Sequence, residues 1–128
     1  AEVEVAVMGN NNPIASICGE IDSGAEFYDY EAKYVTDTSV AYIPARISET
    51  VAEQVRDYAV KAYMALGCRG LSRVDFFVTY DDERIVFNEI NTLPGFTSIS
   101  MYPKLFEASG VPYSQVLDRL LEYAMEER

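Results

Sequence analysis

The 128-residue sequence contains no histidine and no tryptophan, and it has only two cysteines. Without histidine the chain lacks the commonest general base, which excludes Ser-His-Asp triads and the usual zinc sites. Cys18 and Cys68 lie fifty positions apart, which is not a metal-binding spacing. Any chemistry must use carboxylates, lysine, arginine, tyrosine, backbone amides or a metal ion. Cysteine usage of this kind is typical of a reduced, cytoplasmic protein.

Basic residues are also scarce, because 10 lysines and arginines face 21 acidic residues and leave a net charge of −11. This charge argues against a nucleic acid or an anionic membrane as the main partner. The sequence contains no long apolar run, and its first residues do not have the pattern expected of a signal peptide. Residues 1–128, with 49% apolar residues, are expected to form a single domain. The start at Ala1, in what reads as mid-strand, suggests a piece of a longer chain.

Two strand-like runs, residues 73–78 and 85–91, are separated by a short acidic stretch. A three-residue turn at 81–83 would join them as a hairpin. This turn predicts three cross-strand pairs, Phe77–Phe87, Asp75–Glu89 and Arg73–Asn91. Because strand side chains alternate between faces, the charged and amide groups then share one face, while Val74, Phe76 and Val78 point into a core.

Facing carboxylates repel, so the pair of Asp75 and Glu89 is favourable mainly when a cation lies between them. Oxygen ligands without histidine or thiolate suit Mg²⁺ or Mn²⁺ better than zinc. The alternative is a solvated polar face on which Arg73 forms a salt bridge with Asp75 or Glu89. Spacing alone does not decide between the two.

The segment that follows, residues 91–101, favours the metal interpretation. It combines Pro94-Gly95 with small hydroxyl residues, and such loops offer backbone N–H groups to an anion. The alternative is an ordinary type II turn, for which Pro followed by Gly is the preferred pair.

The rest of the chain reads as alternating strands and helices. Strands are expected at residues 2–8, with Glu2, Glu4 and Ala6 off the core, at about 15–21, antiparallel to the first, and at 41–43. A helix is expected to follow, with an apolar stripe that runs from Val51 to Leu66 and includes Tyr58. Its N-terminus is expected to have a capping box formed by Thr50 and Glu53, and Gly67 is expected to cap its C-terminus. Two further helices are expected, one from Pro103 to Gly110 and one from Ser114. The leucines of the last helix are predicted to be core residues.

Residues 27–34 are rich in aromatic and charged side chains and have no clear period, so they are interpreted as a functional loop. The alternative is that the tyrosines cover a neighbouring surface and that Lys33 pairs with Glu31.

Three motifs in order, FYDYEAKY (27–34), GLSRVDFFV (70–78) and FNEINTLPGFTSISMYPKL (87–105), resemble the carboxy-terminal domain of D-alanyl-D-alanine ligases. These ligases are members of the ATP-grasp superfamily. The resemblance implies an α+β fold, the ATP-grasp C-terminal lobe, with a mainly antiparallel β-sheet flanked by helices. It also implies that an amino-terminal and a central domain belong to the complete enzyme, which is expected to be a homodimer. The 128 residues alone are expected to fold but not to ligate.

The activity implied by the resemblance is the ATP-dependent ligation of two D-alanines for peptidoglycan precursors. ATP phosphorylates one D-alanine, and the amine of a second attacks the acyl phosphate. ATP and two Mg²⁺ or Mn²⁺ ions are the implied cofactors. The resemblance implies that Asp75, Glu89 and Asn91 are the metal ligands and that Glu89 also belongs to the cofactor-binding residues. It implies that Arg73 is the cation that steadies the transferred phosphoryl group. The Gly95 amide is the implied oxyanion donor.

The resemblance assigns further roles in nucleotide and substrate binding. The loop with Tyr28, Tyr30, Lys33 and Tyr34 would fold over the nucleotide, with Lys33 at a phosphate and Tyr34 in the catalytic set. Ser100 and the Met101 amide, with Gly95 beside them, would hold the carboxylate of the second D-alanine. Glu2 would bind the ATP ribose and Phe27 the adenine, although a two-residue shift would give the ribose role to Glu4.

The second substrate remains open between D-alanine and D-serine. Ligases that make D-alanyl-D-lactate usually carry a histidine in the loop that here ends at Tyr34, and this chain has no histidine. Two other interpretations are an ATP-grasp ligase for a different second substrate and a non-catalytic acidic module that binds Mg²⁺ or a partner protein.

Overall fold

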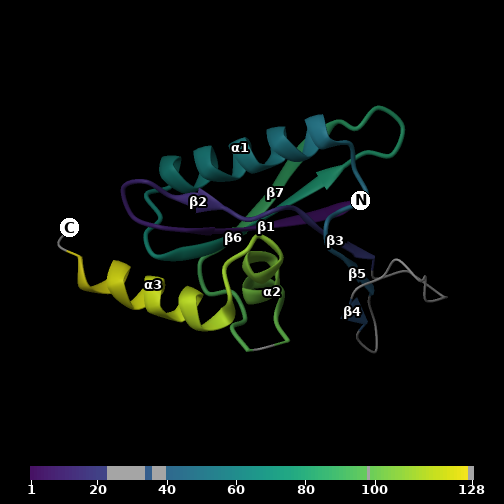
Figure 1. Cartoon of the computed structure of the whole chain (residues 1–128). Helices are drawn as coiled ribbons and strands as arrows, with labels where there is room; N and C mark the ends of the chain where they lie inside the picture. Colours follow the sequence, from purple (N-terminus) through teal and green to yellow (C-terminus); the bar gives the residue numbers. More distant parts are fainter. Residues whose placement is uncertain (23–33, 36–39, 98, 127–128) are drawn as a thin grey trace.

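The computed structural model describes residues 1–22, 34–35, 40–97 and 99–126. Within these residues a seven-stranded sheet has one helix on one face and two on the other (Figure 1). The strands are β1 (Glu2–Met8), β2 (Ile14–Ala15), β3 (Gly19–Asp22), β4 (Tyr34–Val35), β5 (Val40–Tyr42), β6 (Leu71–Val78) and β7 (Ile85–Asn91). The helices are α1 (Glu49–Ala65), α2 (Met101–Ala108) and α3 (Tyr113–Met125).

The strand order is β4-β5-β3-β1-β6-β7, with β2 paired to β1, and all of these pairings are antiparallel. The predicted strand at about 15–21 is split, because residues 16–18 do not belong to either β2 or β3. Both parts still pair with β1, as the antiparallel prediction required. The mixed α+β fold predicted from the sequence is therefore confirmed.

The central strand β1 is buried on both faces. Val3, Val5 and Val7 pack under α1, as the alternation predicted. Ala6 and Met8 point to the other face and pack against α2 and α3. The prediction that Ala6 lies off the core is therefore wrong, because a second layer of helices covers that end of the strand. Only the first residues of β1 leave room for polar side chains on this face.

The hairpin of β6 and β7 has the predicted pairs Asp75–Glu89 and Arg73–Asn91, but it reaches them by a different route. Its turn is one residue longer, since Thr79 lies opposite Arg84. A β-bulge in β7 then restores the register, because Phe76 pairs with Phe87 while Asp75 pairs with Glu89. The predicted pair Phe77–Phe87 is wrong, and Asn88 is the extra residue.

Helix α1 begins at Glu49 with Ser48 as its N-cap, and the Ser48 hydroxyl accepts a hydrogen bond from the Val51 amide at 3.3 Å. The predicted capping box at Thr50 and Glu53 is wrong, because Glu53 instead forms an ion pair with Arg56 at 2.9 Å. At the other end Gly67 has a φ of 68°, so the predicted C-terminal glycine cap is confirmed.

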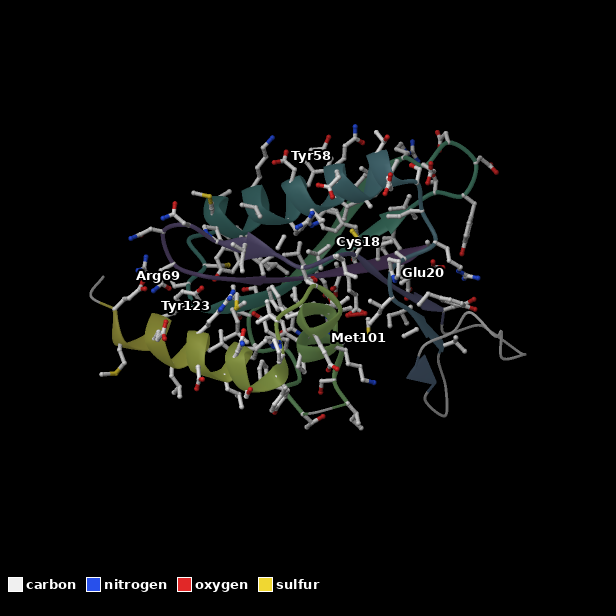
Figure 2. All side chains as sticks on the ribbon, viewed as in Figure 1. Cys18, Glu20, Tyr58, Arg69, Met101 and Tyr123 are labelled. Carbon is white, nitrogen blue, oxygen red and sulfur yellow. The ribbon has the colours of Figure 1, made fainter. Side chains whose placement is uncertain are left out.

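The apolar stripe of α1 is narrower than predicted. Val55, Ala59 and Tyr63 are buried, whereas Tyr58 is 45% and Leu66 is 62% exposed. Figure 2 shows Tyr58 on the outer side of the helix. A stripe of i and i+4 positions suffices to cover the sheet, and the flanking apolar residues remain at its margins.

The two C-terminal helices also depart from prediction. Helix α2 begins at Met101, so Pro103 lies within its first turn rather than at its start. In α3 only Val116 is fully buried, while Leu117 and Leu121 are exposed, so the prediction that all its leucines are core residues is wrong. None of the helices among the described residues combines the length and apolar character needed to cross a membrane.

The capping geometry of α1 predicts a difference between two neighbouring hydroxyl residues. Ser48→Ala removes the side-chain acceptor for the Val51 amide and should lower the free energy of unfolding by about 1 kcal/mol. Thr50→Ala is the matched control and should change it by less than about 0.5 kcal/mol. Urea denaturation followed by circular dichroism measures both. An equal loss in the two variants would contradict the assignment of Ser48 as the N-cap.

Candidate phosphate and metal site

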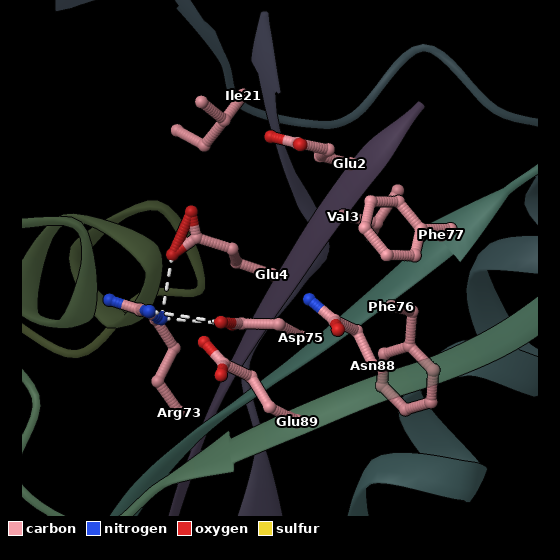
Figure 3. A pocket seen from close by; sticks show the side chains of 10 residues that line it. All are labelled: Glu2, Val3, Glu4, Ile21, Arg73, Asp75, Phe76, Phe77, Asn88 and Glu89. Carbon is pink, nitrogen blue, oxygen red and sulfur yellow. Dashed lines mark hydrogen bonds and ion pairs between the residues drawn. The ribbon is translucent and has the colours of Figure 1, made fainter. Parts of the chain in front are cut away.

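A polar cleft with a volume of about 270 Å³ lies where β1, β6 and β7 run side by side (Figure 3). Polar and charged side chains from all three strands line it, namely Glu2, Glu4, Arg73, Asp75, Asn88 and Glu89. Phe77, which is 41% exposed, contributes an apolar wall. The cleft therefore combines a concentrated negative charge with one aromatic surface.

Three carboxylates occupy adjacent positions on β1, β6 and the edge strand β7. Glu4 pairs with Asp75 on β6, and Asp75 pairs with Glu89 on β7. Glu4 and Asp75 are each only 9% exposed. Like charges at directly opposed positions destabilise a sheet, and burial weakens their screening by water. We refer to Glu4, Asp75 and Glu89 below as the carboxylate row.

Arg73 is the guanidinium of this cleft, and it contacts two members of the row. Its Nε donates to Asp75 Oδ1 at 2.9 Å and its Nη2 donates to Asp75 Oδ2 at 2.9 Å. The same Nε lies 2.7 Å from Glu4 Oε1. The salt bridge of the alternative interpretation is therefore present. The face is solvated only in part, because Glu4 and Asp75 are buried while Glu89 on β7 is exposed.

The short contact with Glu4 is an ion pair without a well-directed hydrogen bond. The Arg73 Nε–H is directed to Asp75, and Glu4 Oε1 is a buried oxygen with no hydrogen-bond partner. The pKa of Glu4 is raised to about 7, chiefly by its burial; Arg73 opposes this shift, and the carboxylates of Asp75, Glu2 and Glu89 add smaller increases. The raised pKa therefore reflects mainly the loss of water around the Glu4 carboxyl group.

The β-bulge changes which residues reach the cleft. Strict alternation would place Asn88 on the face opposite Glu89, yet both side chains line the cleft (Figure 3). A bulge places two residues of one strand opposite one residue of its partner, and this makes the arrangement possible. Asn88, Glu4 and Phe77 are cleft residues that sequence reasoning did not place at the metal and phosphate site. The Glu-x-Glu alternation at residues 2–4 was the available signal for Glu4.

Of the three predicted metal ligands, Asp75 and Glu89 line the cleft and Asn91 does not. Asn91 is paired with Arg73, as predicted, but its Oδ1 accepts a hydrogen bond from the Leu93 amide at 3.0 Å. This bond shapes the first residues of the loop that follows β7.

The loop after β7 brings Gly95 and Ser100 together. A Cβ on Gly95 would lie 3.2 Å from Ser100 Oγ, so the two residues are in close approach. Gly95 has no positive φ, and the type II turn of the alternative interpretation is therefore wrong. Ser100 is the N-cap residue of α2, but its hydroxyl accepts from the Thr97 amide at 3.0 Å rather than capping the helix. Met101 is the first residue of that helix, where backbone amides favour an anion.

Other predicted site residues come from the loop at 27–34. Phe27, Tyr28, Tyr30 and Lys33 lie outside the described residues. Tyr34 belongs to strand β4, where it pairs with Ala41. The predicted ribose ligand Glu2 lines the cleft at the open end of β1.

The chemistry of the donor set fits a hard divalent cation. Asp75 and Glu89 supply carboxylate oxygens from neighbouring strands, and the orphaned Glu4 oxygen marks uncompensated charge beside them. The conformation itself is not that of a formed metal centre. Among the residues that the structure describes, no group of three or more histidine, cysteine, aspartate or glutamate side chains is arranged to hold an ion. Both Asp75 oxygens instead accept from Arg73.

Comparison with known proteins identifies the family. The model of the family described as "D-ala D-ala ligase C-terminus" matches residues 1–122. A D-alanine–D-alanine ligase of Chlorobium limicola is 56% identical over 125 residues, which are 98% of this chain and 34% of that protein. The chain thus spans about a third of the length of the curated relatives it matches.

Two solved structures have the same fold. The VanG D-Ala:D-Ser ligase of Enterococcus faecalis is 44% identical, with a TM-score of 0.82 over 95% of this chain and 35% of that one. The D-alanine–D-alanine ligase of Bacillus anthracis, solved in complex with ATP, is 31% identical, with a TM-score of 0.76 over 97% of this chain and 39% of that one. The chain belongs to the family of D-alanine–D-alanine ligase C-terminal domains.

The raised pKa of Glu4 predicts how stability depends on pH. The folded chain holds a proton on Glu4 up to about pH 7, whereas the unfolded chain releases it near 4.5. The stabilisation is therefore complete below about pH 4.5 and is lost as the pH rises to about 7, by about 3 kcal/mol. Glu4→Gln should lack this component, so its stability relative to wild type should rise over this range. Urea denaturation at several pH values measures the difference, and a difference that stays constant from pH 4 to 8 would contradict the assignment.

Proposed function

We propose that this chain is the part of an ATP-dependent D-alanyl-D-alanine ligase that binds the ATP phosphates and their metal ions. The carboxylate row and the single guanidinium beside it, in a chain of this family, carry the proposal. The activity is the ligation of two D-alanines through an acyl phosphate, for peptidoglycan precursors in the cytoplasm. The remaining two thirds of the relatives' length would supply the other side of the nucleotide site, and the complete ligase is proposed to be a homodimer.

Asp75, Glu89 and Asn91 would hold Mg²⁺ or Mn²⁺. When bound, the metal neutralises charge on the phosphates during transfer. Asp75 and Glu89 are supported by their adjacent positions in the cleft. Asn91 lies two residues further along β7 than Glu89, and its Oδ1 would have to exchange the Leu93 amide for the metal.

Arg73 would steady the transferred phosphoryl group, because it is the guanidinium that faces the cleft among the described residues. The Gly95 amide would serve as an oxyanion donor. Ser100 and the Met101 amide, at the start of α2, would hold the carboxylate of the second D-alanine.

Further residues are proposed to bind the nucleotide. Glu2, which lines the cleft, is proposed for the ribose. Phe27, which lies outside the described residues, is proposed for the adenine. Lys33 would reach a phosphate and Tyr34 would close over the substrates with the rest of the 27–34 loop. Such closure excludes water from an acyl phosphate that is easily hydrolysed.

We favour D-alanine as the second substrate, because a relative named as a D-alanine–D-alanine ligase is 56% identical to this chain. D-Serine is the second candidate, because a D-Ala:D-Ser ligase is 44% identical. Exchange of D-alanine for D-serine or D-lactate as the acceptor in the complete ligase separates these possibilities.

Phosphate release that depends on D-alanine tests the proposed function. The isolated chain should show none, because its half of the nucleotide site is open. A complete ligase in which this segment replaces the corresponding third of the Chlorobium limicola protein should be active. Asp75→Asn and Arg73→Ala in that ligase should each reduce kcat/KM by roughly 10²- to 10³-fold, since each removes charge stabilisation of the transferred group.

The matched control is Asp81→Asn, an exposed acidic residue in the turn of the same hairpin, which should leave the rate within about twofold. Full activity of the Asp75→Asn and Arg73→Ala ligases would contradict the proposal and favour a non-catalytic acidic module.

A further inference from the structure

The roles proposed for Asp75 and Arg73 compete for the same atoms. Both carboxylate oxygens of Asp75 accept hydrogen bonds from Arg73, at 2.9 Å each. A divalent cation on Asp75 would face a guanidinium across one carboxylate, and two cations at such a distance repel strongly in a buried site. Arg73 must therefore turn away from Asp75 before that residue can bind a metal.

Glu4 is placed to receive the guanidinium. Its Oε1 lies 2.7 Å from Arg73 Nε, closer than either Asp75 oxygen lies to its donor. A rotation of the planar guanidinium that turns the Nε–H from Asp75 to Glu4 would form a direct hydrogen bond and free both Asp75 oxygens.

The hydrogen bonding of Glu4 gives an independent reason why it should receive the Arg73 guanidinium. Its Oε1 is buried without a hydrogen-bond partner, and such an atom costs free energy unless another state satisfies it. The charged groups that face it are Glu2 on its own strand, Arg73 and Asp75 on β6, and Glu89 on β7. Arg73 is the cation among these groups, so it is the donor that can satisfy the orphaned oxygen.

Glu4 and Arg73 each pair with a small residue in the sheet. Glu4 pairs with Gly19 on β3. Leu105 and Met101 fill the space above this glycine, because an added Cβ would lie 2.6 Å from Leu105 and 2.9 Å from Met101. The exchange must therefore take place on the side of Arg73, which pairs with Ala6 on β1.

We propose that Glu4 is a positioning residue, a second anchor that holds Arg73 Nε when Asp75 turns its oxygens to a metal ion. With Nε on Glu4, the two Nη groups of Arg73 are free to point at the phosphate. The inference rests on the proposed function, because it takes Asp75 to be a metal ligand. It goes beyond that function by giving a role to a residue outside the proposed metal and substrate sets.

A double-mutant cycle tests the proposal on the 128-residue chain. Mn²⁺ binding is measured by the loss of the free-ion signal in electron paramagnetic resonance, for wild type, Glu4→Leu, Arg73→Met and the double variant. Glu4→Leu, which removes the acceptor for Arg73 Nε, should weaken binding by at least about fivefold more when Arg73 is present than in the Arg73→Met background. An equal factor in both backgrounds would mean that Glu4 acts only through its charge, and would overturn the proposal.

A matched control removes another buried carboxylate that holds an arginine. Glu20 on β3 is 2% exposed and accepts from Arg46 Nη2 at 2.8 Å, but it does not line the cleft. Glu20→Gln should leave Mn²⁺ binding within about twofold in chains shown to be folded by circular dichroism. Asp75→Asn should abolish most of the binding. Unchanged binding in Asp75→Asn would overturn the proposed metal role itself, a failure distinct from the loss of coupling between Glu4 and Arg73.

The exchange can also be followed by nuclear magnetic resonance. In the wild-type chain the Arg73 Nε–H resonance should shift on addition of Mg²⁺ and ADP yet stay protected from exchange with water, because Glu4 replaces Asp75 as its acceptor. In Glu4→Leu, which has no side-chain acceptor, the same addition should speed its exchange at least about tenfold. A resonance in the wild type that does not respond to Mg²⁺ and ADP would overturn the proposal.

Discussion

The repulsion within the carboxylate row is the constraint on which the site depends. Glu4, Asp75 and Glu89 are held at adjacent positions by the antiparallel pairing of β1, β6 and β7, and Arg73 compensates only part of their charge. The cross-strand pairing of β1 with β6 and of β6 with β7 keeps the strands from moving apart to relieve this repulsion. The free energy stored in the row is therefore available for binding a cation. Packing under α1 and against α2 keeps the three strands in place.

The same repulsion explains why the cleft is expected to have two states, one without a metal ion and one with a metal ion bound. Without a metal ion, Asp75 and Arg73 satisfy each other, and Glu4 keeps an unsatisfied oxygen. A metal on Asp75 would displace Arg73 toward Glu4 and leave the guanidinium facing phosphate. The charges of the row and its arginine thus couple metal binding to the position of the group that handles phosphate.

Much of this arrangement could be predicted from the sequence, because alternation determines which side chains share a strand face. The pairs Asp75–Glu89 and Arg73–Asn91 were predicted correctly, although the longer turn and the bulge at Asn88 cancel each other along the hairpin. A bulge depends on the fit of two strands, so no local pattern could reveal it. Glu4 was weighed only for the ribose, because its proximity to Arg73 requires that β1 and β6 be neighbours. The burial of Ala6 and the exposure of Leu121 depend on where α2 and α3 pack, which periodicity within one helix does not determine.

A crystal structure of this chain with Mn²⁺ and a non-hydrolysable ATP analogue would show whether the carboxylate row binds the metal. We expect an anomalous peak for manganese within about 2.3 Å of oxygens of both Asp75 and Glu89. We also expect Arg73 Nε to donate to Glu4 and its Nη groups to face the phosphates. A manganese peak away from these two carboxylates, or Arg73 still bound to both oxygens of Asp75 beside the metal, would contradict these expectations.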